Sequence, residues 1–356
     1  MKLLAYSVAL VVFCVVFTQA KECEELRSCA ECTKAVTPDG AKCDWCTESN
    51  SCTKRFSRKC PKKFRVGGIA YNCPMPLPIG VKYNETFVKN IVYPFIALAP
   101  ETDRTRLERN LKCSVEGVQL VGNYHVPCNK RGNNDSTCYG FTALIPAQKA
   151  IVISFRGSVG IPQLLNQAYE FLYPPTSPFA ATGGQVYTYY HRSFLGVWGA
   201  GMANDVRRLA KLHPDYEVWS FGLSLGGALA SLASSQVVAD GVVPSSRIKL
   251  ITFGQPRVGN VVYAEAHDRL VPYSFRVISA RDVIPAVGKG RAMHHRYEVW
   301  YPKGMKEGSE FRISEQAESR AGFLSATSHN AYDHLMYYGH DLMTYYREYE
   351  CPATAF

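Results

Sequence analysis

Short apolar runs alternate with helical stretches over the second half of the chain. Runs of five or six apolar-rich residues, typical of buried strands, occupy residues 150–155, 217–221, 249–253 and 274–279. Helical patterns occupy residues 196–212 and 228–238. This alternation predicts an α/β fold with a mostly parallel sheet, covering helices, and a functional site in the loops that follow the carboxyl ends of the strands.

The first twenty residues have the pattern of a secretory signal peptide. Lys2 gives a positive start, residues 3–17 are apolar, and small residues end the segment at Ala20, where we expect cleavage. The alternative of an uncleaved anchor is weaker, because the apolar stretch is shorter than the roughly 20 residues of a spanning helix. Glycosylation sequons at Asn84 and Asn134 agree with a secreted, extracellular protein that keeps no membrane anchor.

Cysteines divide the mature chain into two parts. Thirteen are present, and loss of Cys14 with the signal leaves twelve, of which eight lie within residues 21–73. An even number in a secreted chain indicates disulfides. The alternating prolines of residues 74–78 form a stiff spacer, so we predict a cysteine-rich module over 21–73 and an α/β-hydrolase domain over 78–356.

The small module carries two C-x-x-C motifs, at Cys29 and Cys32 and at Cys43 and Cys46. Inside a cell this pairing would suggest zinc, whereas behind a signal peptide disulfides are favoured. A module of about fifty residues needs such cross-links, since it buries little core. The spacing resembles the plexin-semaphorin-integrin type of module, which implies interaction or spacing and no catalysis, and the sequence does not choose the pairing.

The composition is that of a globular protein, with 47% hydrophobic and 20% charged residues. Net charge is +10, and loss of Lys2 leaves +9. Seven basic and no acidic residues lie in segment 54–65, a run that can attract an anionic lipid surface or matrix polymer. A merely solvated face is the favoured interpretation of this run, and nucleic acid is disfavoured because the chain is secreted and no binding module is recognised.

The motif Gly222-Leu223-Ser224-Leu225-Gly226 follows one predicted strand and precedes a predicted helix. This context is typical of a nucleophile elbow, in which the glycines permit a sharp turn that exposes the serine hydroxyl. Ser224 is therefore the candidate nucleophile, and the backbone N–H of Leu225 is a candidate oxyanion donor. A chance match in a glycine-rich chain is the alternative.

A serine nucleophile needs a base and an acidic residue that orients the base. In α/β hydrolases these follow the serine in the order acid, histidine. Asp282 comes in the loop after the strand predicted at 274–279, and its alternative is a surface ion pair with Arg281. His334 begins a helix-like run at 335–346 and is the candidate base, with His329 as its closest competitor.

A second oxyanion donor is expected at another strand end. The strand predicted at 150–155 runs into Arg156-Gly157-Ser158, so Ser158 is that candidate, with an ordinary Gly-Ser turn as the alternative. Residues 161–173 have an amphipathic helical pattern that fits a lid over the site and equally fits a docked core helix.

These segments together resemble the class 3 lipases over roughly residues 80–350. The motifs that carry the resemblance are Phe155-Arg156-Gly157-Ser158, His191-Arg192-Ser193-Phe194, the elbow 224–230, Thr252-Phe253-Gly254-Gln255-Pro256-Arg257-Val258-Gly259, Asp282-Val283-Ile284-Pro285 and Asp333-His334. The resemblance implies Ser224 as nucleophile, Asp282 as the orienting acid and His334 as base. By analogy it also implies disulfides Cys113–Cys351 and Cys128–Cys138.

Two features depart from that family: Leu223 stands where histidine is usual before the serine, and the cysteine-rich module precedes the hydrolase domain. We predict a secreted serine hydrolase acting on lipid esters at an interface, specifically a triacylglycerol lipase, with no metal or organic cofactor. Phospholipase A1 and small-ester carboxylesterase are the enzymatic alternatives. An inactive binding protein acting through its cysteine-rich module is the alternative of another class.

Overall fold

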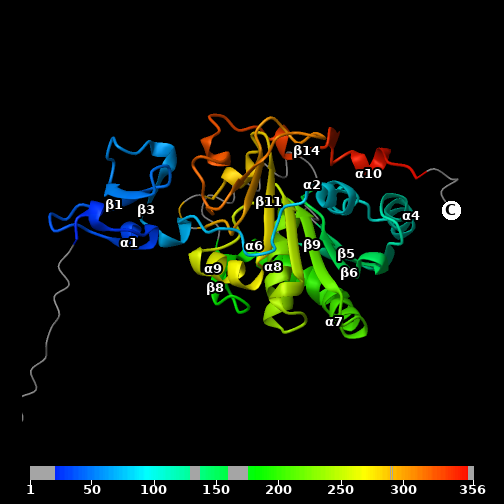
Figure 1. The fold of residues 1–356 in the computed structure, drawn as a ribbon. Coiled ribbons are helices and arrows are strands. Elements are labelled where there is room, and N and C mark those ends of the chain that lie inside the picture. The colour runs from blue at the N-terminus through cyan, green and yellow to red at the C-terminus, as the bar shows by residue number, and fades with distance from the viewer. Residues whose placement is uncertain (1–20, 129–136, 159–174, 289, 291, 352–356) are drawn as a thin grey trace, which may run out of the picture. The chain divides into compact units, whose positions relative to one another are not determined.

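The computed structural model describes residues 21–128, 137–158, 175–288, 290 and 292–351 (Figure 1). It divides into two compact units, residues 1–70 and residues 71–356. The predicted signal peptide, the amphipathic segment 161–173 and the sequon at Asn134 lie outside the described residues. Within the ranges that are described, no helix has the length and apolarity needed to span a membrane.

Disulfides and a small sheet hold the first unit together. Helix α1 (Cys29–Lys34) precedes three antiparallel strands in the order β2-β1-β3, with bounds β1 Cys43–Cys46, β2 Ser51–Lys54 and β3 Arg65–Gly67. Its bridges include Cys23–Cys43, Cys32–Cys52 and Cys46–Cys60. These six sulfurs are buried at the centre of the unit, and since they are bonded to one another they are not thiolate ligands for zinc.

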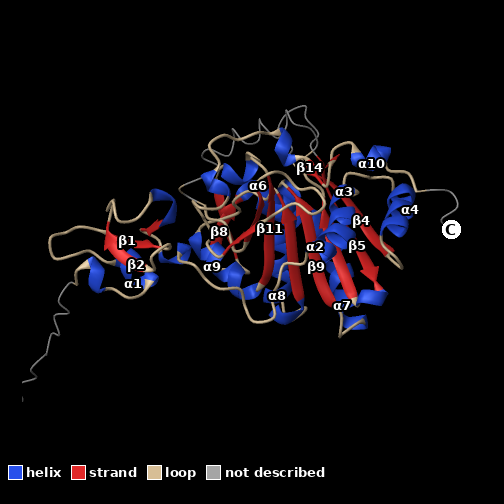
Figure 2. Cartoon of the chain, turned by 45° about the horizontal axis from the view of Figure 1, so that its top comes forward, coloured by secondary structure: helices blue, strands red, loops and turns tan. Residues whose placement is uncertain are grey.

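An eight-stranded sheet forms the second unit, in the order β13-β12-β11-β10-β9-β6-β5-β4 (Figure 2). Within this sheet the neighbouring strands β6, β9, β10, β11 and β12 pair in parallel, and antiparallel strands flank them on both sides. This confirms the predicted mostly parallel sheet. The bounds are β4 Gln119–Pro127, β5 Thr137–Ile145, β6 Ala150–Phe155, β9 Glu217–Leu223, β10 Ile248–Phe253, β11 Tyr273–Ser279, β12 Glu298–Tyr301 and β13 Arg312–Ser314.

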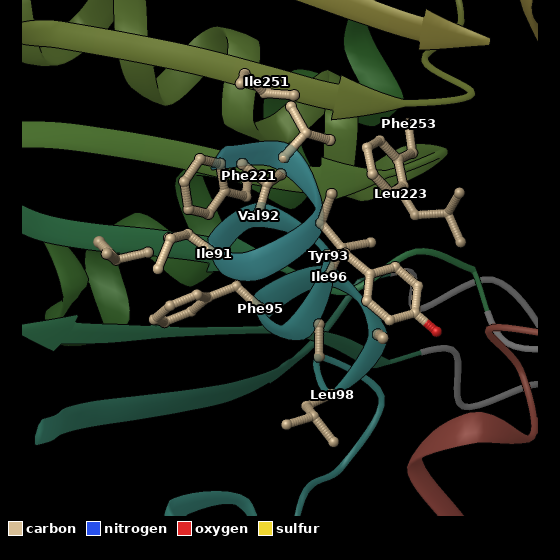
Figure 3. Close-up of a cluster of buried hydrophobic side chains, with 14 of the residues drawn as sticks. Ile91, Val92, Tyr93, Phe95, Ile96, Leu98, Phe221, Leu223, Ile251 and Phe253 are labelled. Atoms are coloured by element: carbon tan, nitrogen blue, oxygen red, sulfur yellow. The ribbon is translucent and has the colours of Figure 1, made fainter. Parts of the chain in front are cut away.

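Helices cover both faces of this sheet. Because neighbouring strand residues point to opposite faces, Ile151 and Ile153 join one buried cluster and Val152 joins the other. The first cluster contains residues of α6 (Thr188–Val197), α7 (Ala203–Leu212), α8 (Leu225–Ala239) and α9 (Val261–Leu270), and the second contains residues of α3 (Tyr93–Ala97) and α4 (Arg104–Ser114). Figure 3 shows residues around α3 packed beside Phe221 and Phe253 of the strands.

Two predicted helices differ in the structure. The predicted helix 196–212 is interrupted, because α6 ends at Val197 and α7 begins at Ala203, with Gly201 between them at φ 129°. The helix predicted at 335–346 is wrong: β14 (Met336–Tyr337) and β15 (His340–Asp341) form a hairpin there, and only α10 (Tyr345–Glu348) is helical. Tyr338 and Gly339 have φ 52° and 84°, which is the geometry of a two-residue hairpin turn.

The remaining elements are short. They are α2 (Glu85–Phe87), β7 (Thr176–Phe179) and β8 (Gly184–Tyr187). The exposed Asn84 caps α2, since its side-chain oxygen accepts a hydrogen bond from the N–H of Phe87 at 3.0 Å. Asn84, the acceptor asparagine of the other sequon, therefore lies at the surface of the second unit.

Helix α4 is tied to the end of the described chain. The structure contains the disulfide Cys113–Cys351, and Asn110 Nδ2 donates to the carbonyl of Tyr349 at 3.0 Å. A second bridge, Cys128–Cys138, joins the ends of β4 and β5. The chain segment that follows the sheet is thus held against α4 by both a covalent and a hydrogen bond.

Candidate active site

The strand–turn–helix context expected around Ser224 is present. Strand β9 ends at Leu223, Ser224 has φ 56° and ψ −123°, and α8 begins at Leu225. Non-glycine residues seldom adopt a positive φ, so the serine is held in a conformation that the surrounding structure must enforce. The first N–H groups of α8, which have no partner within the helix, lie next to it.

Two glycines make this turn possible. A Cβ on Gly222 would lie 2.2 Å from the carbonyl carbon of Gly226, and a Cβ on Gly226 would lie 2.2 Å from the carbonyl oxygen of Phe155. The start of α8 therefore packs directly on β9 and β6, at a separation that only glycine allows. This is the physical reason for the G-x-S-x-G spacing in this chain.

Asp282 and His334 form a buried pair. His334 Nδ1 lies 3.0 and 2.9 Å from the two carboxylate oxygens of Asp282, and both residues are 0% exposed. Asp282 follows β11, and its Oδ1 also accepts the N–H of Ile284 at 2.8 Å. Over the described residues, the other ring nitrogen of His334, Nε2, has no hydrogen-bond partner. The carboxylate thus fixes the ring through one nitrogen and leaves the other open.

The junction of Phe253 and Gly254 connects this pair with the serine. Ser224 N–H donates to the carbonyl of Phe253 at 2.9 Å, across the neighbouring ends of β9 and β10. The next residue, Gly254, has φ 53°, and a Cβ there would lie 2.6 Å from both Asp282 Oδ2 and His334 Nδ1. Phe253 thus contacts the backbone of Ser224 and Gly254 contacts the Asp282–His334 pair, at the carboxyl ends of β9, β10 and β11.

A second polar pair flanks the first. Arg281 N–H donates to Asp333 Oδ2 at 3.1 Å, and Arg281 Nε lies 3.5 Å from the same oxygen. Asn330 N–H donates to the carbonyl of Arg281 at 2.8 Å. Arg281 is therefore paired with Asp333, and the alternative of an ion pair between Arg281 and Asp282 is wrong. The two loops are clamped together one residue before each member of the buried pair.

Ser158 lies close to the elbow through its neighbour. A Cβ on Gly157 would be 2.9 Å from the carbonyl oxygen of Leu223 and 3.6 Å from Ser224 Cβ. The segment that leaves β6 thus passes beside the turn, and Ser158 is its next residue. Together with the N–H of Leu225, it places two candidate donors beside the serine from two different elements.

The sequence of this chain is similar to that of known lipases. A family model described as Lipase (class 3) matches residues 152–291. A lipase of Caenorhabditis elegans is 30% identical over 295 residues, which cover 74% of this chain and 81% of that lipase. The chain belongs to the class 3 lipase family. The members of this family are carboxylic ester hydrolases.

Two fungal lipases are also similar to this class 3 lipase. A lipase of Rhizomucor miehei is 29% identical over 200 residues, covering 54% of this chain and 53% of the relative. The crystal structure of a lipase from Rhizopus microsporus var. chinensis superposes with a TM-score of 0.61 at 21% identity, covering 76% of this chain and 95% of that one. The second unit accordingly has the α/β-hydrolase fold.

Leu223, the unusual residue of the elbow, belongs to the core. Its side chain is 6% exposed and lies in the same buried cluster as Phe253, Phe221 and Tyr93 (Figure 3). In this class 3 lipase the position before the serine therefore fills apolar space on the α3 face of the sheet. The substitution changes packing behind the elbow.

Arg257 belongs to the motif 252–259, but its position in the sequence assigns it no role. Its side chain is 1% exposed, donates to the carbonyl of Pro285 at 2.9 Å and binds Glu318, with Nε 2.7 Å from Oε1. Pro285 lies three residues after Asp282, so the hydrogen bond from Arg257 holds the loop that carries Asp282. No sequence signal marks this role, because it depends on contacts with Pro285 and Glu318, which are distant in the chain.

The other histidines after Asp282 lie elsewhere. His329 is exposed and its ring packs on Phe323 at 5.4 Å, whereas the Asp282 carboxylate is hydrogen-bonded to His334. His340 contacts Tyr93 and Tyr345 at the hairpin. Among the residues that the structure describes, His334 is thus the histidine hydrogen-bonded to Asp282.

His294 and His295 join His267 in a buried polar network. The rings of His267 and His295 stack at 3.8 Å, and ligand atoms of His267, Asp268 and His295 lie within 4.8 Å of one another. However, Asp268 already binds Arg296 at 2.9 Å, and His295 Nε2 lies 2.8 Å from Gln255. These partners occupy the groups that a cation would need, so the network is a structural one.

The buried histidines predict a loss of stability in acid. Burial lowers the pKa of His267, and burial followed by nearby arginines or a neighbouring histidine lowers those of His294 and His295 well below the usual value. Below about pH 6.5 the unfolded chain then binds more protons than the folded one, so the free energy of unfolding falls by at most about 1.4 kcal/mol per pH unit for each histidine.

His267→Phe tests this, because within the described residues neither ring nitrogen of His267 has a hydrogen-bond partner, Nδ1 lying 3.9 Å from Asp268 Oδ1, and phenylalanine keeps the stacked ring. Urea unfolding of this class 3 lipase should show a smaller drop between about pH 7.5 and about pH 5.5 in the variant than in the wild type. An equal drop in both proteins would exclude His267 from the acid response.

The Arg281–Asp333 clamp predicts a loss of turnover. Asp333→Asn removes the ion pair with Arg281 and should lower kcat roughly ten- to a hundredfold with little change in KM, because a small shift of His334 misaligns the reacting groups. Asp240→Asn is the matched control, since it breaks the surface ion pair Arg207–Asp240 of 3.0 Å. A change in KM alone, or the same loss in both variants, would contradict a positioning role.

Proposed function

We propose that this class 3 lipase is a secreted serine hydrolase that cleaves the carboxylic ester bonds of lipids, with Ser224, His334 and Asp282 as its catalytic triad. The buried hydrogen-bonded pair of His334 and Asp282 beside the elbow is the observation that carries the proposal. A carboxylate on Nδ1 selects the tautomer in which Nε2 accepts a proton. Nε2 is the ring nitrogen that has no other partner among the described residues.

The proposed reaction has two halves. Ser224 Oγ attacks the ester carbonyl while His334 Nε2 takes the hydroxyl proton, and the protonated histidine then gives that proton to the departing alcohol. A water molecule repeats the attack on the acyl-enzyme, with His334 again as base, and releases the fatty acid. The N–H of Leu225 and the polar groups of Ser158 stabilise the oxyanion formed in each half.

Triacylglycerol at an interface is the proposed substrate. Its support is the family and the fungal lipase fold of the second unit. Secretion is proposed from the signal-like residues 1–20 together with the disulfides in both units. No metal or organic cofactor enters the proposed chemistry, because the triad and two donors supply every proton transfer and charge contact.

A fluorophosphonate probe tests the nucleophile directly. The wild-type protein should be labelled at Ser224, and absence of labelling would favour a binding protein over an enzyme. A panel of triacylglycerols, phospholipids and short water-soluble esters then decides the substrate class. Highest activity on a phospholipid would identify a phospholipase A1, and highest activity on soluble short esters would identify a carboxylesterase.

A further inference from the structure

The basic segment 54–65 of the first unit separates into structural and free charges. Lys54 binds Asp39 at 2.9 Å and Arg55 binds Asp44 at 3.0 Å. Arg65 donates to the carbonyls of Ser57 at 2.6 Å and Cys60 at 2.8 Å. Three of the seven basic residues thus hold the loop in shape, and this use could not be read from the sequence.

The other four basic residues are all exposed: Arg58, Lys59, Lys62 and Lys63. Within the described part of the chain none of them has an ion pair with a carboxylate, although the ammonium of Lys63 lies 4.7 Å from the ring centre of Phe64. The loop therefore presents a surplus of positive charge to solvent that no acidic neighbour offsets. Such a surplus attracts anionic surfaces.

An aromatic side chain stands within the same loop. Phe56 is 78% exposed and has φ 64°, a conformation that residues with large side chains avoid. Ser57 N–H donates to the carbonyl of Lys54 at 3.0 Å, so Phe56 lies within a tight turn at the end of β2. Cys52 and Cys60 on either side of the turn are both fixed by disulfides. The turn and the flanking disulfides thus hold the apolar ring of Phe56 exposed to water.

We propose that this loop, comprising Phe56, Arg58, Lys59, Lys62 and Lys63 and here termed the basic loop, binds the surface of anionic phospholipid. Cationic side chains around an exposed aromatic ring are the combination that binds lipid interfaces, since the charges meet the head groups and the ring enters the acyl boundary. A sulfated matrix polymer would satisfy the charges but has no apolar layer for Phe56. The lipid surface therefore accounts for both features.

This inference rests on the proposed function for its purpose, which is to hold a lipid-hydrolysing enzyme at its interface. The binding itself requires no catalysis. Anchoring through the small unit would raise the residence time at the surface while leaving hydrolysis of a soluble ester unchanged. The two proposals can consequently fail separately.

The test measures sedimentation of the full-length chain, in a Ser224→Ala background that prevents lipid hydrolysis, with phosphatidylcholine vesicles that contain or lack phosphatidylserine. Binding should be at least about tenfold tighter to the anionic vesicles and should weaken with salt. Changing Arg58, Lys59, Lys62 and Lys63 together to serine should remove at least about tenfold of that affinity.

A matched variant controls for net charge. Lys21, Arg27, Lys34 and Lys42 are exposed in the same unit, and changing these four to serine removes the same charge from other positions. The affinity of this control should fall by no more than about threefold, because screening limits distant charges. An equal loss in both fourfold variants would overturn a localised site.

Phe56→Asn separates the aromatic contribution from the charge. Asparagine tolerates the left-handed backbone, so the loop should keep its shape while losing the ring. Affinity for anionic vesicles should fall about fivefold with the salt dependence retained. Vesicle binding unaffected by Phe56→Asn, or binding to heparin but not to vesicles, would overturn the lipid proposal in favour of a polyanion site.

Measurements of activity and labelling distinguish failure of the enzyme proposal from failure of the basic-loop proposal. In the active background, the variants of the basic loop should hydrolyse a short soluble ester at the wild-type rate. Lack of fluorophosphonate labelling would remove the enzyme proposal and leave the vesicle result to stand on its own. Lack of vesicle binding with normal labelling would remove only the basic-loop proposal.

Discussion

Ser224→Ala should reduce ester hydrolysis by a factor on the order of 10⁶, because removing the nucleophile of a serine triad costs nearly all of the chemistry that the triad supplies. The alanine variant keeps the fold of the elbow only if its backbone still adopts the positive φ of Ser224. Circular dichroism and the urea midpoint should therefore be recorded beside kcat/KM and probe labelling.

The partners of the serine should show non-additive losses. His334→Ala should cost about as much as Ser224→Ala, and the double variant should be no slower than either single variant, because the residues act as one unit. Asp282→Asn should cost roughly 10⁴-fold, since an amide no longer selects the productive tautomer of His334. Independent, multiplying losses in the double variant would contradict the proposed triad.

Gly254→Ala should nearly abolish activity, by a factor of at least about 10². The new Cβ would lie 2.6 Å from both Asp282 Oδ2 and His334 Nδ1, so the buried pair must move apart or tilt. Neither group has room to yield, because both are fully buried and Arg257 and Asp333 hold the loops that carry them. The loss should appear mainly in kcat.

Gly241→Ala is the matched control for backbone strain. Gly241 has φ 69°, comparable to the φ 53° of Gly254, and a Cβ at Gly241 meets nothing within 4 Å. Both variants should lose roughly 1–2 kcal/mol of stability from the left-handed backbone alone. Full activity in Gly241→Ala with loss in Gly254→Ala would assign the effect to the pair, whereas equal activity in both would contradict it.

Sheet elements were predictable because their apolar runs are buried on both faces. The runs at 150–155, 217–221 and 249–253 became β6, β9 and β10 with ends displaced by at most two residues. The prediction of a helix at 335–346 is wrong because its apolar residues, Leu335, Tyr337 and Leu342, pack into the core in and beside a hairpin. Spacing alone does not distinguish these two arrangements, and the turn at Gly339 decides between them.

In the candidate site, too, some residues are predictable from the sequence and others are recognised only in the fold. Ser224, Asp282 and His334 each follow a strand or a motif, so sequence could nominate them. Gly254 and the Arg281–Asp333 pair act through distances between loops that are far apart in the chain, and such distances exist only in the fold.

The disulfide Cys113–Cys351 closes most of the hydrolase unit, residues 113–351, into a covalent loop. It spans 238 residues, and in a chain-entropy account closing a loop of this size raises the free energy of the unfolded state by about 5 kcal/mol. His334 lies inside that closed loop, between strands β13 and β14. Ends of chains ordinarily fray first. Local opening of the chain beyond Cys351 is therefore stopped by a covalent bond before it reaches His334, so the proposed base is an interior residue of the loop that the disulfide closes.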